Sequence, residues 1–308
     1  MSLIHPPLAD SRSRIASSRQ SAPAADPLVV GDWRLGRQLA QTGYFCLHQA
    51  QPRGAPTAAP FDYVVKAPRD STQLGLATAM LRREAQVARQ VGHEHLMTIL
   101  DDRSADATPH LVFPYLPGAT LQSRILAAAN SGRQLSLSAA IWAVRQAAGA
   151  LAALHRRGWL HGDLQPGNLL IAPSGHVTLC DLGLARRLDT SECSSAGVWA
   201  GSPHFAAPEM WLPREPLTAA ADLYSLGAVL FAALTGAPPF AAESETALAL
   251  QHLRTACPAL HERRGDVSPG LERLVRTMLA KEPLRRPDSS VVVEQLTRLE
   301  IESLSRRC

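Results

Sequence analysis

The sequence predicts an α+β fold with two lobes, a small antiparallel β-sheet lobe followed by a larger, mainly helical lobe. Short strand-like runs dominate between Trp33 and Phe113. After Pro117-Gly118, apolar residues recur mostly at the spacing of helices. The chain has 308 residues, of which 46% are hydrophobic, so it can form one two-lobed unit with a sizeable core.

In the first lobe, we expect strands over 33–39, 44–50, 61–67 and 110–113, and one helix over about 76–91. The apolar face of that helix carries Met80, Val87 and Val91, and Glu84 lies on the same face. A buried carboxylate needs a cation, and Lys66 is the nearest candidate in the sequence.

In the second lobe, we expect helices over 138–155 and 219–234 and near 245–255, 270–280 and 289–304. The stretch 219–234 is apolar nearly all round, which predicts a buried central helix that Gly236 ends. A hairpin is expected where two apolar runs, 169–171 and 176–180, flank the turn Pro173-Ser174-Gly175.

The domain organisation expected from composition has four parts. Residues 1–30 form a disordered tail rich in Ser, Pro, Ala and Arg, residues 31–117 the first lobe, residues 118–300 the second lobe, and residues 301–308 a C-terminal tail. No signal peptide and no membrane span is expected. Five cysteines without CxxC spacing indicate a reducing cytoplasm.

Charge composition argues against one class of partner and marks one residue. The net charge is +4 without a basic stripe interleaved with aromatics, so we expect no nucleic-acid binding. Of 31 lysines and arginines only Lys66 and Lys281 are lysines, which leaves 29 arginines. A lysine kept at the end of the strand-like run Tyr63-Val-Val-Lys66 suggests a task that a compact ammonium performs and a broad guanidinium does not, such as fitting between phosphates and a carboxylate.

Three polar side chains are expected to meet at one edge of the predicted hairpin. The cassette His161-Gly-Asp163-Leu-Gln-Pro-Gly-Asn168 directly precedes its first strand, and Asp181-Leu-Gly183 ends the run that forms the second. Two carboxylates and an amide at one point suit a hard divalent cation with phosphate oxygens, together with a base that faces a hydroxyl.

These motifs resemble those of bacterial serine/threonine protein kinases of the eukaryotic (Hanks) type, and the resemblance extends from about Trp33 to Leu299. It implies a protein-kinase-like fold, ATP and Mg²⁺ as cofactors, and a protein substrate. It also implies the main site residues: Lys66 pairs with phosphate, Glu84 is its helix partner, Asp163 is the catalytic base, and Asn168 and Asp181 are metal ligands.

The resemblance extends to the nucleotide pocket and to the substrate-binding side. His110-Leu-Val-Phe113-Pro-Tyr-Leu116 looks like the hinge, where the Pro114 carbonyl and the Leu116 N–H would serve adenine. The remaining pocket residues implied are Ala40, Gly43, Val65, Phe113 and Leu170. The run 201–209, which ends in Pro208-Glu209, is similar to the end of the activation segment. Asp222 resembles the residue that caps the catalytic loop, and Arg286 the arginine that pairs with Glu209.

The sequence departs from the family pattern at three places. The glycine-rich loop would fall at Leu39 to Leu47, where Ala40, Thr42 and Phe45 replace its signature glycines and only Gly43 remains. Such a loop uses backbone N–H groups to approach phosphate, so the loss predicts weaker or reshaped nucleotide binding. Gln165 replaces the lysine that follows the base by two residues and brings no charge to the transition state.

At the third departure, Gly162 replaces the arginine that would bind a phosphate on the activation loop. We therefore hypothesise that activity does not depend on phosphorylation there, and that replacing Thr190, Ser191, Ser194 and Ser195 by alanine leaves activity nearly intact.

Three functions remain open at this point. The leading one is a serine/threonine protein kinase that transfers the γ-phosphoryl of ATP to a protein hydroxyl. The second is a pseudokinase that acts as a nucleotide-binding or scaffolding module, favoured by the altered loop and Gln165. The third is a phosphotransferase of small molecules such as aminoglycosides or choline, in which the loop also reads His-Gly-Asp with a downstream Asn. A metal site at His93-Glu94-His95 is not expected, because Met97 stands where a second HExxH histidine would be needed.

Overall fold

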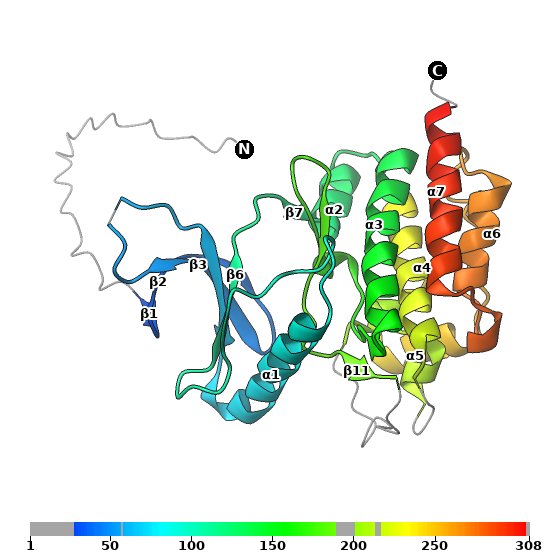
Figure 1. Cartoon of the computed structure of the whole chain (residues 1–308). Helices are drawn as coiled ribbons and strands as arrows, with labels where there is room; N and C mark the ends of the chain where they lie inside the picture. Colours follow the sequence, from blue (N-terminus) through cyan, green and yellow to red (C-terminus); the bar gives the residue numbers. More distant parts are fainter. Residues whose placement is uncertain (1–27, 57, 189–200, 213–216, 306–308) are drawn as a thin grey trace, which may run out of the picture.

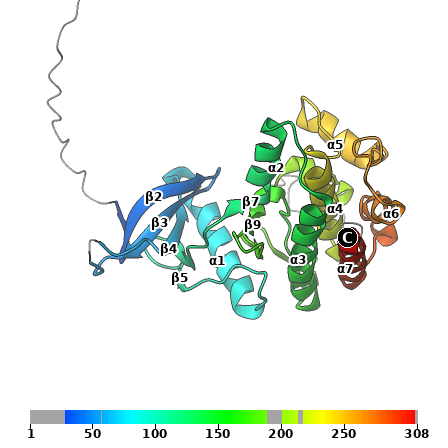
Figure 2. The ribbon, with the colours of Figure 1, turned by 90° about the horizontal axis from the view of Figure 1, so that it is seen from above.

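The computed structural model describes residues 28–56, 58–188, 201–212 and 217–305 and confirms the two-lobed α+β fold. The sheet lobe, coloured blue to teal, lies on one side of the molecule, and the helical lobe, coloured green to red, lies on the other (Figure 1, Figure 2). The chain passes from one lobe to the other after Pro114, the end of the last sheet-lobe strand.

The sheet lobe is built on a six-stranded antiparallel sheet with the order β1-β2-β3-β4-β6-β5. Its strands are β1 Val29–Val30, β2 Trp33–Gln41, β3 Phe45–Pro52, β4 Tyr63–Pro68, β5 Asp101–Arg103 and β6 His110–Pro114. The polar edge strand β5 was not expected, because Asp-Asp-Arg carries none of the β-branched or aromatic residues that favour strands.

Helix α1 (Leu74–Gln90) packs on one face of this sheet, and the sheet separates the lobe's apolar residues into two groups. The group between sheet and helix contains Phe45, Val64 and Leu81, all buried. The group on the opposite face contains Leu35, Val65 and others. Since successive side chains of a strand point to opposite faces, Val64 and Val65 separate in this way.

The helical lobe contains α2 Leu121–Asn130, α3 Leu137–Arg156, α4 Ala219–Thr235, α5 Glu245–Arg254, α6 Pro269–Met278 and α7 Ser289–Ser305. As predicted, α4 is buried from Ala221 to Leu234 and lies among the other helices (Figure 1). It ends at Gly236, whose positive φ of 89° is the left-handed conformation that glycine adopts without strain. The helix α2 was not predicted.

Helix α3 is the one helix among the described residues that is long and apolar enough to cross a membrane by length and composition. However, 67% of its apolar stretch is buried inside the molecule. Residues of α3 belong to the same apolar core as those of α4 and α7, so its hydrophobicity is explained by packing.

Short strands at the junction of the lobes carry the loops of the site. β9 (Leu169–Ile171) pairs with β10 (Val177–Leu179) as the expected hairpin and with β7 (Ala119–Thr120) on its other side. β8 (Trp159–Leu160) pairs with β11 (Arg186–Arg187). The β7–β9 pairing places β9 beside the chain that enters the helical lobe.

Candidate active site

A cavity of about 520 Å³ lies between the two lobes. The sheet lobe contributes Leu39, Ala40, Val64 and Lys66, among other residues, and the segment Phe113–Leu116 lines the same cavity. The helical lobe contributes Asn168, Leu170, Cys180 and Asp181. The cavity therefore has apolar walls with a small set of charged and amide groups, the composition typical of a small-molecule site.

Lys66 on β4 lies between two carboxylates. Its Nζ is 2.7 Å from Glu84 Oε2 on α1 and 2.8 Å from Asp181 Oδ1 after β10. Burial by itself would lower the pKa of Lys66, but Asp181 and Glu84 more than offset this and raise it, so the ammonium stays charged. The predicted Lys66–Glu84 pair is confirmed, and it joins sheet, helix and the other lobe at one point.

The two carboxylates respond differently to this environment. Burial raises the pKa of Glu84. Burial also acts to raise that of Asp181, but the adjacent Lys66 ammonium outweighs it and holds the pKa below its ordinary value. The Asp181 side chain keeps 32% of its surface exposed, so this carboxylate is charged and reachable from the cavity.

The β9–β10 register explains why Asn168 and Asp181 meet. Leu169 pairs with Leu179, and the Cys180 N–H donates to the Asn168 carbonyl at 2.9 Å, so the residues that flank the hairpin lie side by side. Asp181 has a φ of 67° and is the one described residue other than glycine with a positive φ. Such backbone strain costs on the order of 1–3 kcal/mol and clusters at functional sites.

Asp163 is held by three separate groups. The Ser202 N–H donates to its Oδ1 at 2.9 Å, and Oδ2 accepts from Gln165 Nε2 at 3.0 Å and from Asn168 Nδ2 at 3.3 Å. Asn168 also donates to the Asp163 carbonyl at 2.8 Å. Burial raises the pKa of Asp163, while these donors oppose the shift. The carboxylate is thus fixed in direction and more basic than an ordinary aspartate.

The loop before Asp163 is anchored from the helical core. Asp222 on α4 accepts the N–H groups of His161 at 2.8 Å and Gly162 at 3.0 Å, and also His155 Nε2 at 2.8 Å. Burial acts to raise the pKa of Asp222, but the hydrogen bond from His155 helps to lower it overall. The predicted capping role of Asp222 is confirmed.

Gly162 has a structural reason to be glycine. Its φ is +79°, and a Cβ at this position would lie 2.6 Å from the Leu184 carbonyl oxygen. Any side chain here, including arginine, would be strained. The four residues whose phosphorylation we expect to be unnecessary (Thr190, Ser191, Ser194 and Ser195) lie outside the described residues.

The segment after β6 offers one free donor beside the cavity. The Tyr115 N–H donates to the Asp62 carbonyl at 2.8 Å, and Pro114 has no N–H. The Leu116 N–H makes no hydrogen bond within the described part of the chain. The carbonyl of Pro114 and the N–H of Leu116 therefore remain as the acceptor and donor that we expected from the sequence.

The altered loop forms the tip of the β2–β3 hairpin. Ala40 and Thr42 line the cavity, whereas Gly43 is exposed at the tip and is not among its lining residues. Phe45 is only 2% exposed, and its ring centroid lies 4.6 Å from Lys66 Nζ. The third replaced glycine thus places its side chain in the core behind the lysine, where it does not fill the cavity.

Two of our expectations about the pocket are corrected. Val65 does not reach the cavity, because it lies in the apolar group on the opposite face of the sheet, and Val64 lines the cavity instead. The alternation of strand side chains could have shown this, since Val64 and Lys66 share a face. Gly43, at the tip, does not line it either.

Sequence reasoning also missed the backbone contact of Ser202 with Asp163, which no side-chain pattern encodes.

The end of the activation-segment-like run is tied to the last helices by a buried ion pair. Arg286 donates to both oxygens of Glu209, at 2.6 and 2.8 Å. The side chains are 0% and 6% exposed, respectively. This confirms the pairing expected from the sequence and fixes the segment near Asp163 against the helical core.

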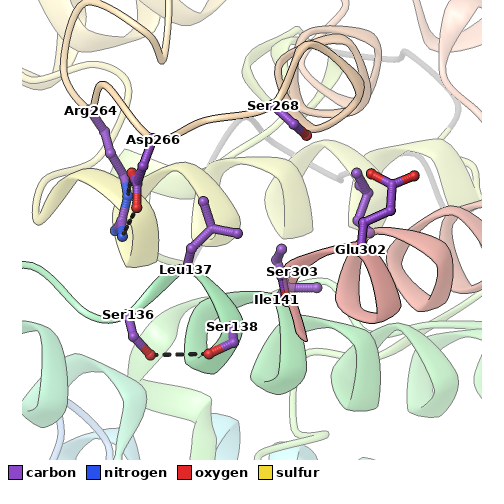
Figure 3. A pocket seen from close by; sticks show the side chains of 10 residues that line it. Ser136, Leu137, Ser138, Ile141, Arg264, Asp266, Ser268, Glu302 and Ser303 are labelled. Atoms are coloured by element: carbon purple, nitrogen blue, oxygen red, sulfur yellow. Dashed lines mark hydrogen bonds and ion pairs between the residues drawn. The ribbon is translucent and has the colours of Figure 1, made fainter. Parts of the chain in front are cut away.

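A second cavity, of about 350 Å³, lies far from these groups, between α3, α6 and α7 (Figure 3). Most of its polar side chains already have local partners. Ser136 and Ser268 cap the first turns of α3 and α6, Arg264 pairs with Asp266, and Ser303 donates to the Glu300 carbonyl. These serine, arginine and aspartate side chains are therefore already engaged and give no sign of a ligand site here.

The histidines near α1 bond to the backbone. The His93 ring accepts the His95 N–H, and the ring of His95 lies 3.0 Å from the Val177 carbonyl. In the described residues no group of three or more His, Cys, Asp or Glu side chains is arranged to hold a metal ion.

Residues 61–296 match the family described as "Protein kinase domain". The chain is 26% identical over 277 residues to "Probable serine/threonine-protein kinase pknA2" of Bifidobacterium longum, covering 88% of this chain and 35% of that protein. It is 33% identical over 211 residues to "Serine/threonine-protein kinase PknB" of Mycolicibacterium smegmatis, covering 67% and 33%. It is 35% identical over 233 residues to "Serine/threonine-protein kinase PknK" of Mycobacterium tuberculosis, covering 74% and 20%. The chain thus spans about a third or less of the length of these relatives.

Proposed function

The chain belongs to the protein kinase family, and we propose that it transfers the γ-phosphoryl group of ATP to a serine or threonine hydroxyl of a protein substrate. One observation carries this proposal above the others. Lys66, Glu84 and Asp181 are joined within 2.8 Å at the wall of a cavity that Asn168 also lines, and Asn168 contacts Asp163. These are the parts that phosphoryl transfer needs, namely a phosphate cation, metal ligands and a base.

The nucleotide would lie in the cavity with adenine against the segment after β6. The Pro114 carbonyl would accept from the adenine amino group, and the Leu116 N–H would donate to a ring nitrogen. Val64, Phe113 and Leu170 supply apolar wall, and the Lys66 ammonium would pair with the phosphates.

The residues present fit a magnesium ion. Asn168 uses its amide nitrogen toward Asp163, which leaves its oxygen available, and Asp181 holds Lys66 through Oδ1, which leaves Oδ2 available. Mg²⁺ prefers a few hard oxygen ligands of this kind together with substrate phosphates. Asn168 and Asp181 would hold the ion, and when bound it would supply positive charge that neutralises the phosphates.

In the reaction, the substrate oxygen would form a bond to the γ-phosphorus while the bond from that phosphorus to the β–γ bridging oxygen breaks. Asp163 would accept the hydroxyl proton. Its raised pKa suits it to that task, and the Ser202 N–H and Gln165 hold it in direction. ADP and the phosphorylated hydroxyl are the products.

The pseudokinase remains the second candidate, because a specific observation favours it. Gln165 stands beside the base as a neutral amide, so this position supplies no cation to stabilise the developing charge. If the protein is a pseudokinase, the cavity would bind nucleotide without turnover and the two lobes would act as a scaffold.

We further propose that the protein works in the reducing cytoplasm, which suits the free thiols of Cys46, Cys180 and Cys257 in the described part of the chain. Burial raises the pKa of Cys180 to about 12 and of Cys257 to about 11, so both remain protonated and unreactive.

Incubation with Mg²⁺ and labelled ATP tests the function. We expect label on serine or threonine of the protein itself or of an added protein. The label should be absent with Asp163→Asn and unchanged with Asp106→Asn, a matched change at an exposed aspartate. Nucleotide binding without label in any protein would favour the pseudokinase, and label on an aminoglycoside or choline but never on protein would favour a small-molecule phosphotransferase.

A further inference from the structure

The tip of the β2–β3 hairpin contains an internal hydrogen-bond acceptor where a glycine would have none. Thr42 Oγ1 accepts the N–H of Phe45 at 3.0 Å and the N–H of Tyr44 at 3.4 Å. A threonine hydroxyl that bonds the backbone two and three residues ahead is a common turn motif. Here it uses up the two amides at the tip, and Thr42 itself lines the cavity.

These amides belong to the loop that, under the proposed function, would cover the phosphates. Loops of this kind hold phosphate oxygens through backbone N–H groups. An N–H that already donates to a hydroxyl must break that bond before it can donate to a phosphate. We infer that Thr42 is a specificity-determining residue whose hydroxyl occupies the place of a phosphate oxygen on Tyr44 and Phe45, and so weakens binding of ADP and ATP relative to adenosine.

The other two replaced glycines do not act in this way. The Ala40 side chain is a methyl group, which neither donates nor accepts. The Phe45 side chain points into the core between the sheet and α1, where it is 2% exposed and does not line the cavity. Thr42 is therefore the replaced position whose side chain both lines the cavity and bonds the loop's own amides.

The Thr42 hydroxyl also donates to the Phe45 carbonyl at 3.4 Å, but two backbone hydrogen bonds hold the hairpin tip without this hydroxyl. The Thr42 N–H donates to the Phe45 carbonyl at 2.8 Å, and the Arg69 N–H donates to the Tyr44 carbonyl at 2.8 Å. Both backbone bonds remain when the side chain is shortened. Removing the hydroxyl should thus free the two amides without unfolding the tip.

The test compares ligands that differ in phosphate on the full chain. Kd is measured for adenosine, MgADP and MgATP with the native protein and with Thr42→Ala, Thr42→Gly and Thr42→Ser. We expect Thr42→Ala and Thr42→Gly to lower the Kd of MgADP and MgATP by about 10-fold or more, as expected for hydrogen bonds gained to a charged acceptor. The Kd of adenosine should not change, and Thr42→Ser, which keeps the hydroxyl, should match the native protein.

The inference about Thr42 rests on the proposed function, and the outcomes distinguish a failure of the Thr42 role from a failure of the proposed function. If the native protein binds MgADP and none of the variants binds it more tightly, the role of Thr42 is wrong and the nucleotide site stands. It is also wrong if adenosine affinity rises as much as that of MgADP, or if Thr42→Ser behaves like Thr42→Ala. If no protein in the series binds adenosine or a nucleotide, the proposed function fails and the role of Thr42 fails with it.

Discussion

Replacing Arg286 by methionine should destabilise the helical lobe far more than the same change at the adjacent Arg285. The Arg286 guanidinium bonds both oxygens of Glu209 and also donates to the carbonyls of Ala280 and Ala220, each at 2.8 Å, and of Lys281 at 3.0 Å. Methionine fills much of the same volume without any donor, so Glu209 would remain buried as an unpaired carboxylate.

Loss of one partner from a buried ion pair costs about 3–5 kcal/mol, because the remaining charge has neither water nor a counter-ion. For a chain of 308 residues, with an unfolding entropy of about 2.1 cal/mol/K per residue, each kcal/mol lowers the melting temperature by about 1.5 °C, which gives an expected decrease of about 4–8 °C. Arg285 pairs with Glu282 at 2.6 Å, but the side chains are 72% and 66% exposed. Such a surface pair contributes about 0–1 kcal/mol.

Differential scanning calorimetry on the two variants measures the contrast directly. A double variant that adds Glu209→Gln to Arg286→Met removes the unpaired charge, so it should lose less stability than the sum of the two single changes. The reasoning is refuted if Arg286→Met melts within 2 °C of Arg285→Met, a margin of about 1 kcal/mol, or if the single losses simply add.

Two further predictions concern charge at other positions. Gln165→Lys should raise kcat for phosphoryl transfer by about 10-fold or more, because it adds a cation beside Asp163 where charge develops. A steady-state kinase assay measures this, with Gln295→Lys on the exposed surface of α7 as the control. Equal kcat in the two variants would contradict the prediction. Burial lowers the pKa of His252 to about 4 from an ordinary 6.5, among Tyr224, Phe240 and Lys281. As the pH falls below 6.5, the unfolded state takes up this proton before the folded state does, so the free energy of unfolding should be about 2 kcal/mol smaller at pH 5 than at pH 7 because of His252. Denaturation of His252→Gln at both pH values should show a smaller decrease. An unchanged decrease would rule out this residue as its source.

Much of the site followed from the sequence because its groups are close in the chain or on regular elements. The hairpin 169–180 brings Asn168 and Asp181 together through local pairing alone, and helical spacing placed Glu84 on the buried face of α1. The alternation of strand side chains also indicates Val64 as the valine that faces the pocket, although we predicted Val65. Local geometry of this kind depends on periods of 2 and 3.6 residues, which a sequence displays directly.

Contacts that involve backbone groups could not be obtained in this way. The Ser202 N–H on Asp163 joins segments 39 residues apart, and every residue except proline has that donor. The same holds for the tip of the β2–β3 hairpin. The sequence showed that Thr42 and Phe45 stand where glycines are usual, but it did not show that one side chain lies in the core and the other bonds the amides.

The sequence by itself determined the two-lobed architecture, the family and most of the charged residues of the site, since these depend on residue type and spacing. Only the tertiary structure decided which face each residue presents, which of the loop's amides are already occupied, and why position 162 is glycine. Those outcomes depend on φ angles and on distances of 2.6–3.4 Å between particular atoms, which residue type and spacing do not specify.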